Sequence, residues 1–185
     1  MAGSLIKVDE FTISSPVASV ILGGGSSGSS GLNASIDSTY DVYMVKVNNV
    51  VPETDSTQLY IRFTASGTPD TSANYDYAYK QLRADSAFNN NSLTNQTVFI
   101  EMVLGTAGNE SANATYYLFN FNNASEYSFY TGESVVRTNL GYLRGHQGGG
   151  VHTVAEANDG INFFFSSSGN IASGTNKENL ICKRE

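Results

Sequence analysis

The chain has 185 residues, a formal net charge of −7 and only 15% charged residues, against about 25% in an ordinary soluble domain. Serine, threonine, asparagine and glycine make up 75 of the 185 residues, and these types favour turns and exposed strand positions over helix interiors. The negative charge and the lack of a Lys/Arg cluster argue against nucleic acid as a partner. The single cysteine, Cys182, excludes an internal disulfide.

The start of the chain gives no sign of a membrane or export segment. Its longest apolar run is VASVIL at 17–22, which is far too short to span a membrane. Asp9 and Glu10 precede this run, where a signal peptide would carry basic residues. We therefore expect a chain that folds in a cytoplasm and has no membrane partner.

Alternation of apolar and polar residues recurs along the chain and predicts β-strands. One segment, 74–83, also fits the start of a short helix. Turn signals separate the predicted strands at 48–55, 66–70, 88–92 and 158–160. Many short strands at this spacing favour an all-β fold, which we predict to be an antiparallel β-sandwich of jelly-roll type. The predicted strands are 16–22, 40–48, 58–63, 74–83, 160–165 and the two arms of a hairpin at 116–130.

Two glycine-rich segments interrupt this pattern. The run GGGSSGSSG at 23–31 has the composition of a flexible linker. Because it lies between two predicted strands, we interpret it as a loop insertion within one domain that covers residues 1–185. The second segment, GHQGGG at 145–150, is expected to be a flexible connection between two late strands.

The aromatic segment YYLFNFNNASEYSFY at 116–130 reads as a hairpin around the polar turn NNAS. Tyr117, Phe119 and Phe121 share one face of its first arm, and Tyr116 and Leu118 share the other. One face can fill the core. The second face is too apolar to be left wholly in water, so a loop, a neighbouring subunit or a ligand is expected to cover it.

Tyrosines are the strongest candidates for recognition, since the chain has 11 Tyr and no Trp and Tyr suits both sugar-binding and protein interfaces. The alternative is that most of them simply line sheet faces. The predicted interface and recognition residues are Tyr75, Tyr77, Tyr79, Tyr116, Leu118, Tyr127 and Tyr130.

Catalytic and metal-binding patterns are weak. His146 and His152 are the only histidines, and Glu156 and Asp159 follow them closely, yet a zinc site requires more convergent ligands than this spacing provides. The chain has no nucleophile elbow, P-loop or dinucleotide fingerprint. We therefore predict no enzyme activity, no catalytic residues, no cofactor and no metal.

Several segments resemble a family of small proteins encoded by tailed bacteriophages, especially marine ones. They are MAGSLIKVDE, STYDVYMVKVNNVVPETDS, LYIRFTASGTPDTSANYDYA, YYLFNFNNASEYSF and DGINFFFSSSGNIASGT. The resemblance covers roughly residues 1–175 and implies a virion structural protein with a jelly-roll or similar β-sandwich. The Gly/Ser segment at 23–31 is longer than the family pattern, and NKENLICKRE replaces its hydrophobic last strand.

The resemblance and the aromatic, charge-poor composition lead to one functional hypothesis. It is a virion protein, made in the host cytoplasm, that decorates the capsid or forms a head fibre through protein–protein contacts. The expected partners are further copies of the chain, as a homo-oligomer such as a trimer, and other virion proteins such as the major capsid protein. The alternative is a tail-fibre or receptor-binding adhesin, or a carbohydrate-binding module, that stacks exposed Tyr side chains on sugars.

Overall fold

The computed structural model describes residues 5–166, 169–172 and 178–184, and almost all of its regular structure is β. One short 3₁₀ turn, η1 (Gly25–Ser27), follows the second strand. The strands are β1 (Leu5–Thr12), β2 (Ser19–Gly23), β3 (Val42–Val50), β4 (Thr57–Ala65), β5 (Thr68–Pro69), β6 (Tyr75–Arg83), β7 (Asn89–Gln96), β8 (Phe99–Leu104), β9 (Ala112–Phe119), β10 (Tyr127–Arg137), β11 (Leu143–Ala155), β12 (Asn158–Phe165) and β13 (Glu178–Arg184).

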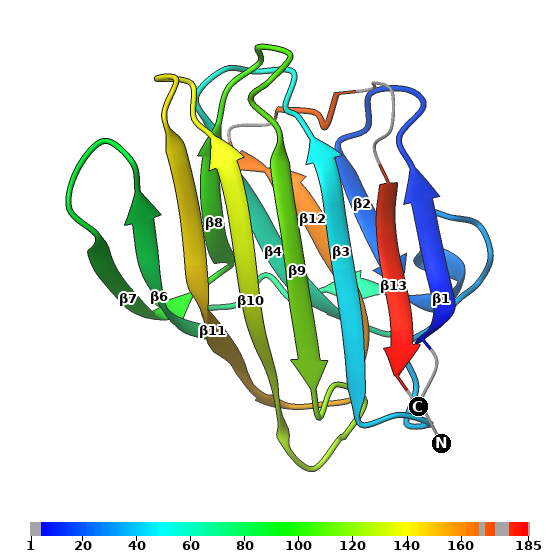
Figure 1. Cartoon of the computed structure of the whole chain (residues 1–185). Coiled ribbons are helices and arrows are strands. Elements are labelled where there is room, and N and C mark those ends of the chain that lie inside the picture. The colour runs from blue at the N-terminus through cyan, green and yellow to red at the C-terminus, as the bar shows by residue number, and fades with distance from the viewer. Residues whose placement is uncertain (1–4, 167–168, 173–177, 185) are drawn as a thin grey trace.

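Two antiparallel sheets pack face to face, which confirms the predicted all-β sandwich (Figure 1). The larger sheet has the strand order β1-β13-β3-β9-β10-β11-β6-β7 and lies in front in Figure 1. The smaller sheet has the order β2-β12-β4-β5, with β8 also paired to β4. Most connections cross from one sheet to the other, so neighbours in sequence lie in opposite layers. The exceptions include the meander β9-β10-β11, which forms the middle of the larger sheet.

Aromatic side chains fill the space between the sheets. Phe63 of β4 is at the centre, with its ring centroid 4.6 Å from that of Phe121 and 5.2 Å from that of Phe99. Tyr75 of β6 meets Phe99 edge-on at 4.8 Å. Edge-to-face pairs of this kind add about 0.5–1.5 kcal/mol each beyond the area that they bury. The core is therefore a set of interlocking rings contributed by both sheets.

Segment 74–83 forms strand β6, as its alternation predicted. Two other expectations about local structure need correction. The expected turn at 88–92 is mostly strand, because β7 begins at Asn89. The expected flexible connection at 145–150 is the middle of β11, the longest strand described. Glycine content suggested flexibility at 145–150, whereas the packing there requires glycine.

The glycines of β11 leave room for rings that lie on the inner face of the sheet. A Cβ at Gly150 would come within 2.6 Å of Phe99 Cε1 and 2.8 Å of Tyr130 Cε1, and a Cβ at Gly148 would come within 2.6 Å of Tyr79 Cβ. A side chain at Gly150 would displace an aromatic ring, and one at Gly148 would collide with the backbone of β6. Although this part of β11 has few side chains, it packs closely against residues of the neighbouring strands.

The Gly/Ser segment at 23–31 does form a loop between two strands, as predicted, and hydrogen bonds attach it to the sandwich. The amide of Gly24 donates to the carbonyl of Asp159 at 2.8 Å, and the amide of Ser29 donates to the carbonyl of Ile21 at 2.8 Å. The buried carboxylate of Asp9 accepts from the amide of Gly23 at 2.7 Å. The loop therefore folds back on β2 instead of extending away from the fold.

The ending that departs from the family pattern still forms a strand. β13 lies between β1 and β3 and pairs antiparallel with both, with Ile181 opposite Asp9 on one side and Val45 on the other. The segment NLICKR thus completes the larger sheet.

Candidate functional site

The outward surface of the larger sheet carries an open groove. Two adjoining hollows of about 440 and 490 Å³ share Thr115 of β9, Glu133 of β10 and Gln147 of β11 as lining residues. A third hollow of about 400 Å³ continues from Gln147 to Lys80 of β6. Together these hollows run across the strands, and we call them the outer groove.

Glycines explain why the sheet is hollow at this point. Alternation along β11 puts Gly145, Gln147 and Gly149 on its outward face. A Cβ at Gly145 would meet the side chain of Leu82, and one at Gly149 would lie 3.5 Å from Thr131 Cγ2. Between Gly145 and Gly149, Gln147 is therefore the only side chain on the outward face of β11, with bare backbone on either side of it.

Glu133 and Gln147 form a pre-oriented polar pair in the outer groove. They are opposite each other in the β10–β11 register, and Gln147 Nε2 donates a hydrogen bond of 2.9 Å to Glu133 Oε1. Each side chain keeps further polar capacity, namely a carboxylate oxygen on Glu133 and an amide carbonyl on Gln147. The hydroxyls of Thr115 and Thr131 line the same hollow.

Apolar side chains are exposed on the same face of the sheet. Tyr117 of β9 is 37% exposed, and Phe129 and Val135 of β10 are 43% and 41% exposed. Tyr117 also lines the outer groove beside Thr131. We call Tyr117, Phe129 and Val135 the outer apolar residues. Such a surface combines hydrogen-bonding groups with aromatic contact area.

Most of the predicted recognition residues lie in the core. Tyr127 is exposed, and Tyr79 is partly buried and stacks on His146 at 4.3 Å between ring centroids. The expectation of an exposed recognition face is wrong for the other five, which the sandwich buries. These five are Tyr75, Tyr77, Tyr116, Leu118 and Tyr130.

The sequence could not show which face of segment 116–119 points into the core. Both faces of this arm are apolar, so alternation shows which residues share a face but not which face points inward. Leu118 and Tyr116 point between the sheets, while Tyr117 points out. Glu133, Gln147 and Thr115 gave no sequence signal, because isolated polar residues on a strand are the norm.

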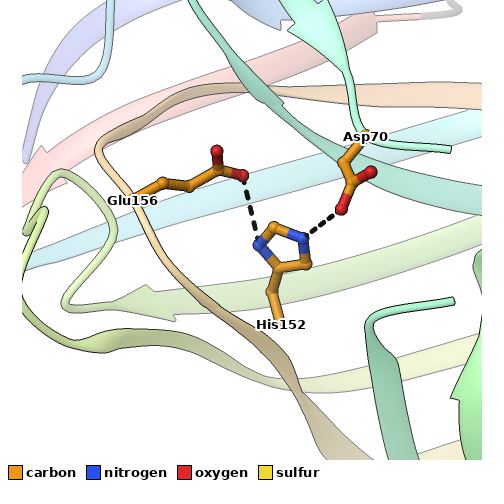
Figure 2. Close-up of side chains that lie close together, drawn as sticks. All are labelled: Asp70, His152 and Glu156. Carbon is orange, nitrogen blue, oxygen red and sulfur yellow. Dashed lines mark hydrogen bonds and ion pairs between the residues drawn. The ribbon is translucent and has the colours of Figure 1, made fainter. Parts of the chain in front are cut away.

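His152 sits between two carboxylates at the end of β11 (Figure 2). Its Nε2 lies 2.8 Å from Asp70 Oδ2, and its Nδ1 lies 3.7 Å from Glu156 Oε1. The imidazole is fully buried, whereas the side chains of Asp70 and Glu156 are 18% and 31% exposed. Asp70 follows β5, while Glu156 comes four residues after His152 in the connection from β11 to β12, so the fold brings together two separate segments.

Neighbouring groups fix this arrangement. The ring of Tyr75 stacks on His152 at 4.8 Å between centroids, and the Tyr75 hydroxyl donates to the backbone carbonyl of Asp70 at 2.9 Å. Asn74 Nδ2 and the amide of Ser72 also donate to the Asp70 carboxylate, at 2.9 and 2.8 Å. Partial burial would raise the pKa of Asp70, but the hydrogen bonds from His152, Asn74 and Ser72 outweigh it and hold that pKa well below its usual range.

From the sequence, His146, His152, Glu156 and Asp159 were a possible ligand set, but the structure groups these residues differently. Asp159 instead accepts hydrogen bonds from Thr64 Oγ1 at 2.7 Å and from the amide of Gly67 at 2.8 Å. The three side chains that offer ligand atoms within 4.8 Å of one another are Asp70, His152 and Glu156. Asp70 is 82 positions away from His152 in sequence, and spacing alone could not pair them.

A second buried polar cluster lies between the sheets around Glu101 of β8. Tyr130 donates to Glu101 Oε1 at 3.4 Å, and burial raises the pKa of Glu101 to about 7. His146 borders the same small cavity, and burial, with a smaller effect of Arg144, lowers the pKa of His146 to about 4. Both groups thus favour their neutral forms near pH 6.

Comparison with models of known protein families, with curated proteins and with solved structures finds no match. Among the residues that the structure describes, no helix has the length and apolar character needed to cross a membrane.

Proposed function

We propose that this chain is a non-catalytic virion structural protein that works through protein–protein contacts on the outward face of its larger sheet. The observation that carries the proposal is the exposure of the outer apolar residues, Tyr117, Phe129 and Val135, on one continuous sheet surface. Exposed apolar area of this kind marks contact surfaces. The resemblance to phage proteins supports a virion as the setting, with capsid decoration as the role.

The expected partners are further copies of this chain and a capsid protein. A regular sheet surface suits both, because the strands present fixed side chains that need little ordering on contact. Aromatic residues are also enriched at the centres of protein interfaces.

Whole particles and purified protein provide the test. We expect the chain to be present in purified virions in a stoichiometric ratio to the capsid subunit, with electron microscopy placing its larger sheet against a neighbour. Phe129→Asp and Val135→Asp should abolish incorporation while the purified variants keep the wild-type melting temperature within a few degrees. Leu140→Asp is the matched control, since Leu140 is 68% exposed in the β10–β11 turn. Normal incorporation of both sheet variants would refute the proposed contact surface.

The outer groove favours one second candidate function, the binding of a neutral oligosaccharide. The specific observation is the Glu133–Gln147 pair, which presents fixed acceptors and donors beside the exposed ring of Tyr117. Sugar hydroxyls require such planar polar groups, and sugar faces pack on aromatic rings. A glycan array should then show binding that Glu133→Gln or Tyr117→Ala removes and Glu126→Gln leaves intact. Absence of glycan binding by the wild-type protein would exclude this function.

A further inference from the structure

The two nitrogens of His152 have unequal surroundings. Nε2 lies within hydrogen-bond distance of Asp70 Oδ2, and because a carboxylate only accepts, this nitrogen carries the hydrogen. In the neutral imidazole the lone pair is then on Nδ1. Nδ1 is buried and has no hydrogen-bond partner.

Nδ1 faces a second acceptor. Glu156 Oε1 lies 3.7 Å away, which is too far for a direct hydrogen bond. A lone pair and a carboxylate that point at each other repel unless a positive charge lies between them. The gap between Nδ1 and Oε1 is therefore a place for a cation.

The gap has the size that a transition-metal ion requires. Zinc bonds to imidazole nitrogen at about 2.0–2.1 Å and to carboxylate oxygen at about 2.0–2.2 Å. A separation of 3.7 Å between the two donor atoms then corresponds to a ligand–metal–ligand angle of about 125°, near the tetrahedral range. Glu156 is partly exposed and borders solvent, so water can fill the remaining positions.

Asp70 lies where a carboxylate would orient the His152 ring toward a metal ion. Metal-bound histidines donate their other ring N–H to a carboxylate or carbonyl, which fixes the tautomer and the ring orientation. Asp70 does this from the opposite side of the ring (Figure 2) and is itself held by Asn74 and Ser72. The stacked ring of Tyr75 prevents the imidazole from rotating.

We propose that His152 Nδ1 and Glu156 form a binding site for a divalent transition-metal ion such as Zn²⁺, with Asp70 as a positioning residue. One imidazole and one carboxylate favour Zn²⁺ and its neighbours in the transition series over Mg²⁺ or Ca²⁺, which take oxygen ligands. The site joins the end of β11 to the connection that leads into β12, so the ion would fix the crossing between the two sheets. It is independent of the outer groove and of the proposed function.

Calorimetric titration of the full chain with ZnCl₂ tests the proposal. We expect saturable binding of one ion that excess Mg²⁺ does not displace, and a rise in melting temperature on binding. Glu156→Gln should abolish both effects, and Asp70→Asn should weaken binding roughly 10–100-fold. Asp55→Asn, which replaces an exposed acid before the start of β4 and so at the far end of that strand from Asp70, should bind as the wild type does.

Two outcomes would overturn the site. The first is a wild-type protein that shows no saturable Zn²⁺ binding, which would mean that the gap between Nδ1 and Oε1 holds no transition-metal ion. The second is unchanged affinity in Glu156→Gln, which would place the ion elsewhere in the chain. Because Glu156 is partly exposed, its substitution leaves the fold intact and the result interpretable.

Discussion

The ring of Tyr116 occupies the space in which a side chain of Gly132 would lie. The two residues are opposite each other in the β9–β10 register, and a Cβ at Gly132 would overlap with Tyr116 Cδ1. Tyr116 is almost completely buried and packs against Phe163 of the smaller sheet, so its ring cannot move away into solvent. The packing in the middle of the larger sheet therefore requires glycine at position 132.

Gly132→Ala should therefore destabilise the protein by about 1–3 kcal/mol, the usual effect of forcing an extra methyl group into a packed core. Urea denaturation followed by circular dichroism measures the change. Gly108→Ala is the control, since no atom lies within 4 Å of its added Cβ, and it should change stability by less than about 0.5 kcal/mol. Equal stability of the two variants would contradict the packing described.

Glu101 makes stability depend on pH in one direction. Its folded-state pKa of about 7 is above the ordinary value of 4.5, so its contribution is fully present below pH 4.5 and is lost as pH rises toward and through 7. The whole change amounts to about 3 kcal/mol. Glu101→Gln, which keeps a neutral polar group next to Tyr116 and Tyr130, should remove this loss. Denaturation at pH 5 and pH 8 would show it.

His146 acts in the opposite direction. Its folded-state pKa of about 4 is below the ordinary value of 6.5, so its contribution is present above pH 6.5 and is lost as pH falls toward and through 4. The effects of Glu101 and His146 therefore offset each other between pH 4.5 and 6.5. In this range Glu101→Gln should become less stable as pH falls, and His146→Asn less stable as pH rises. Parallel pH profiles for both variants would refute the assignment.

Tyr116 and Tyr117 provide a direct test of which face of β9 points inward. Tyr116→Ala should destabilise the protein by about 3–5 kcal/mol, because it leaves a large cavity between the sheets. Tyr117→Ala should change stability by less than about 1 kcal/mol, because 37% of that residue is exposed. Thermal melts of the two neighbouring variants distinguish the faces, and the reverse order of stability would show that β9 is inverted.

Sequence patterns predicted the fold class because strand alternation is local. Segment 58–63 was predicted as a strand, and β4 buries Leu59, Ile61 and Phe63 as alternation requires. The pattern failed where composition competed with packing. The glycines at 148–150 indicate a flexible segment by composition, yet they lie in β11, where Gly148 packs against β6 and Gly150 against rings from β8 and β10.

The candidate sites were less predictable, because they depend on which strands become neighbours. Glu133 and Gln147 meet only because β10 and β11 pair in one register. Asp70 reaches His152 across a sheet-to-sheet crossing. His152 and Glu156 were recognised as possible ligands from their spacing, but the third member of the cluster comes from a segment that carries no ligand motif.

The position of β13 has a consequence for how the protein is made. In the larger sheet β1 pairs with β13 alone, so residues 5–12 emerge from the ribosome long before their partner at 178–184 exists. Contacts so distant in sequence slow folding, and the exposed edge of β3 is open to foreign strands until then. The larger sheet is thus complete only once residues 178–184 have been made.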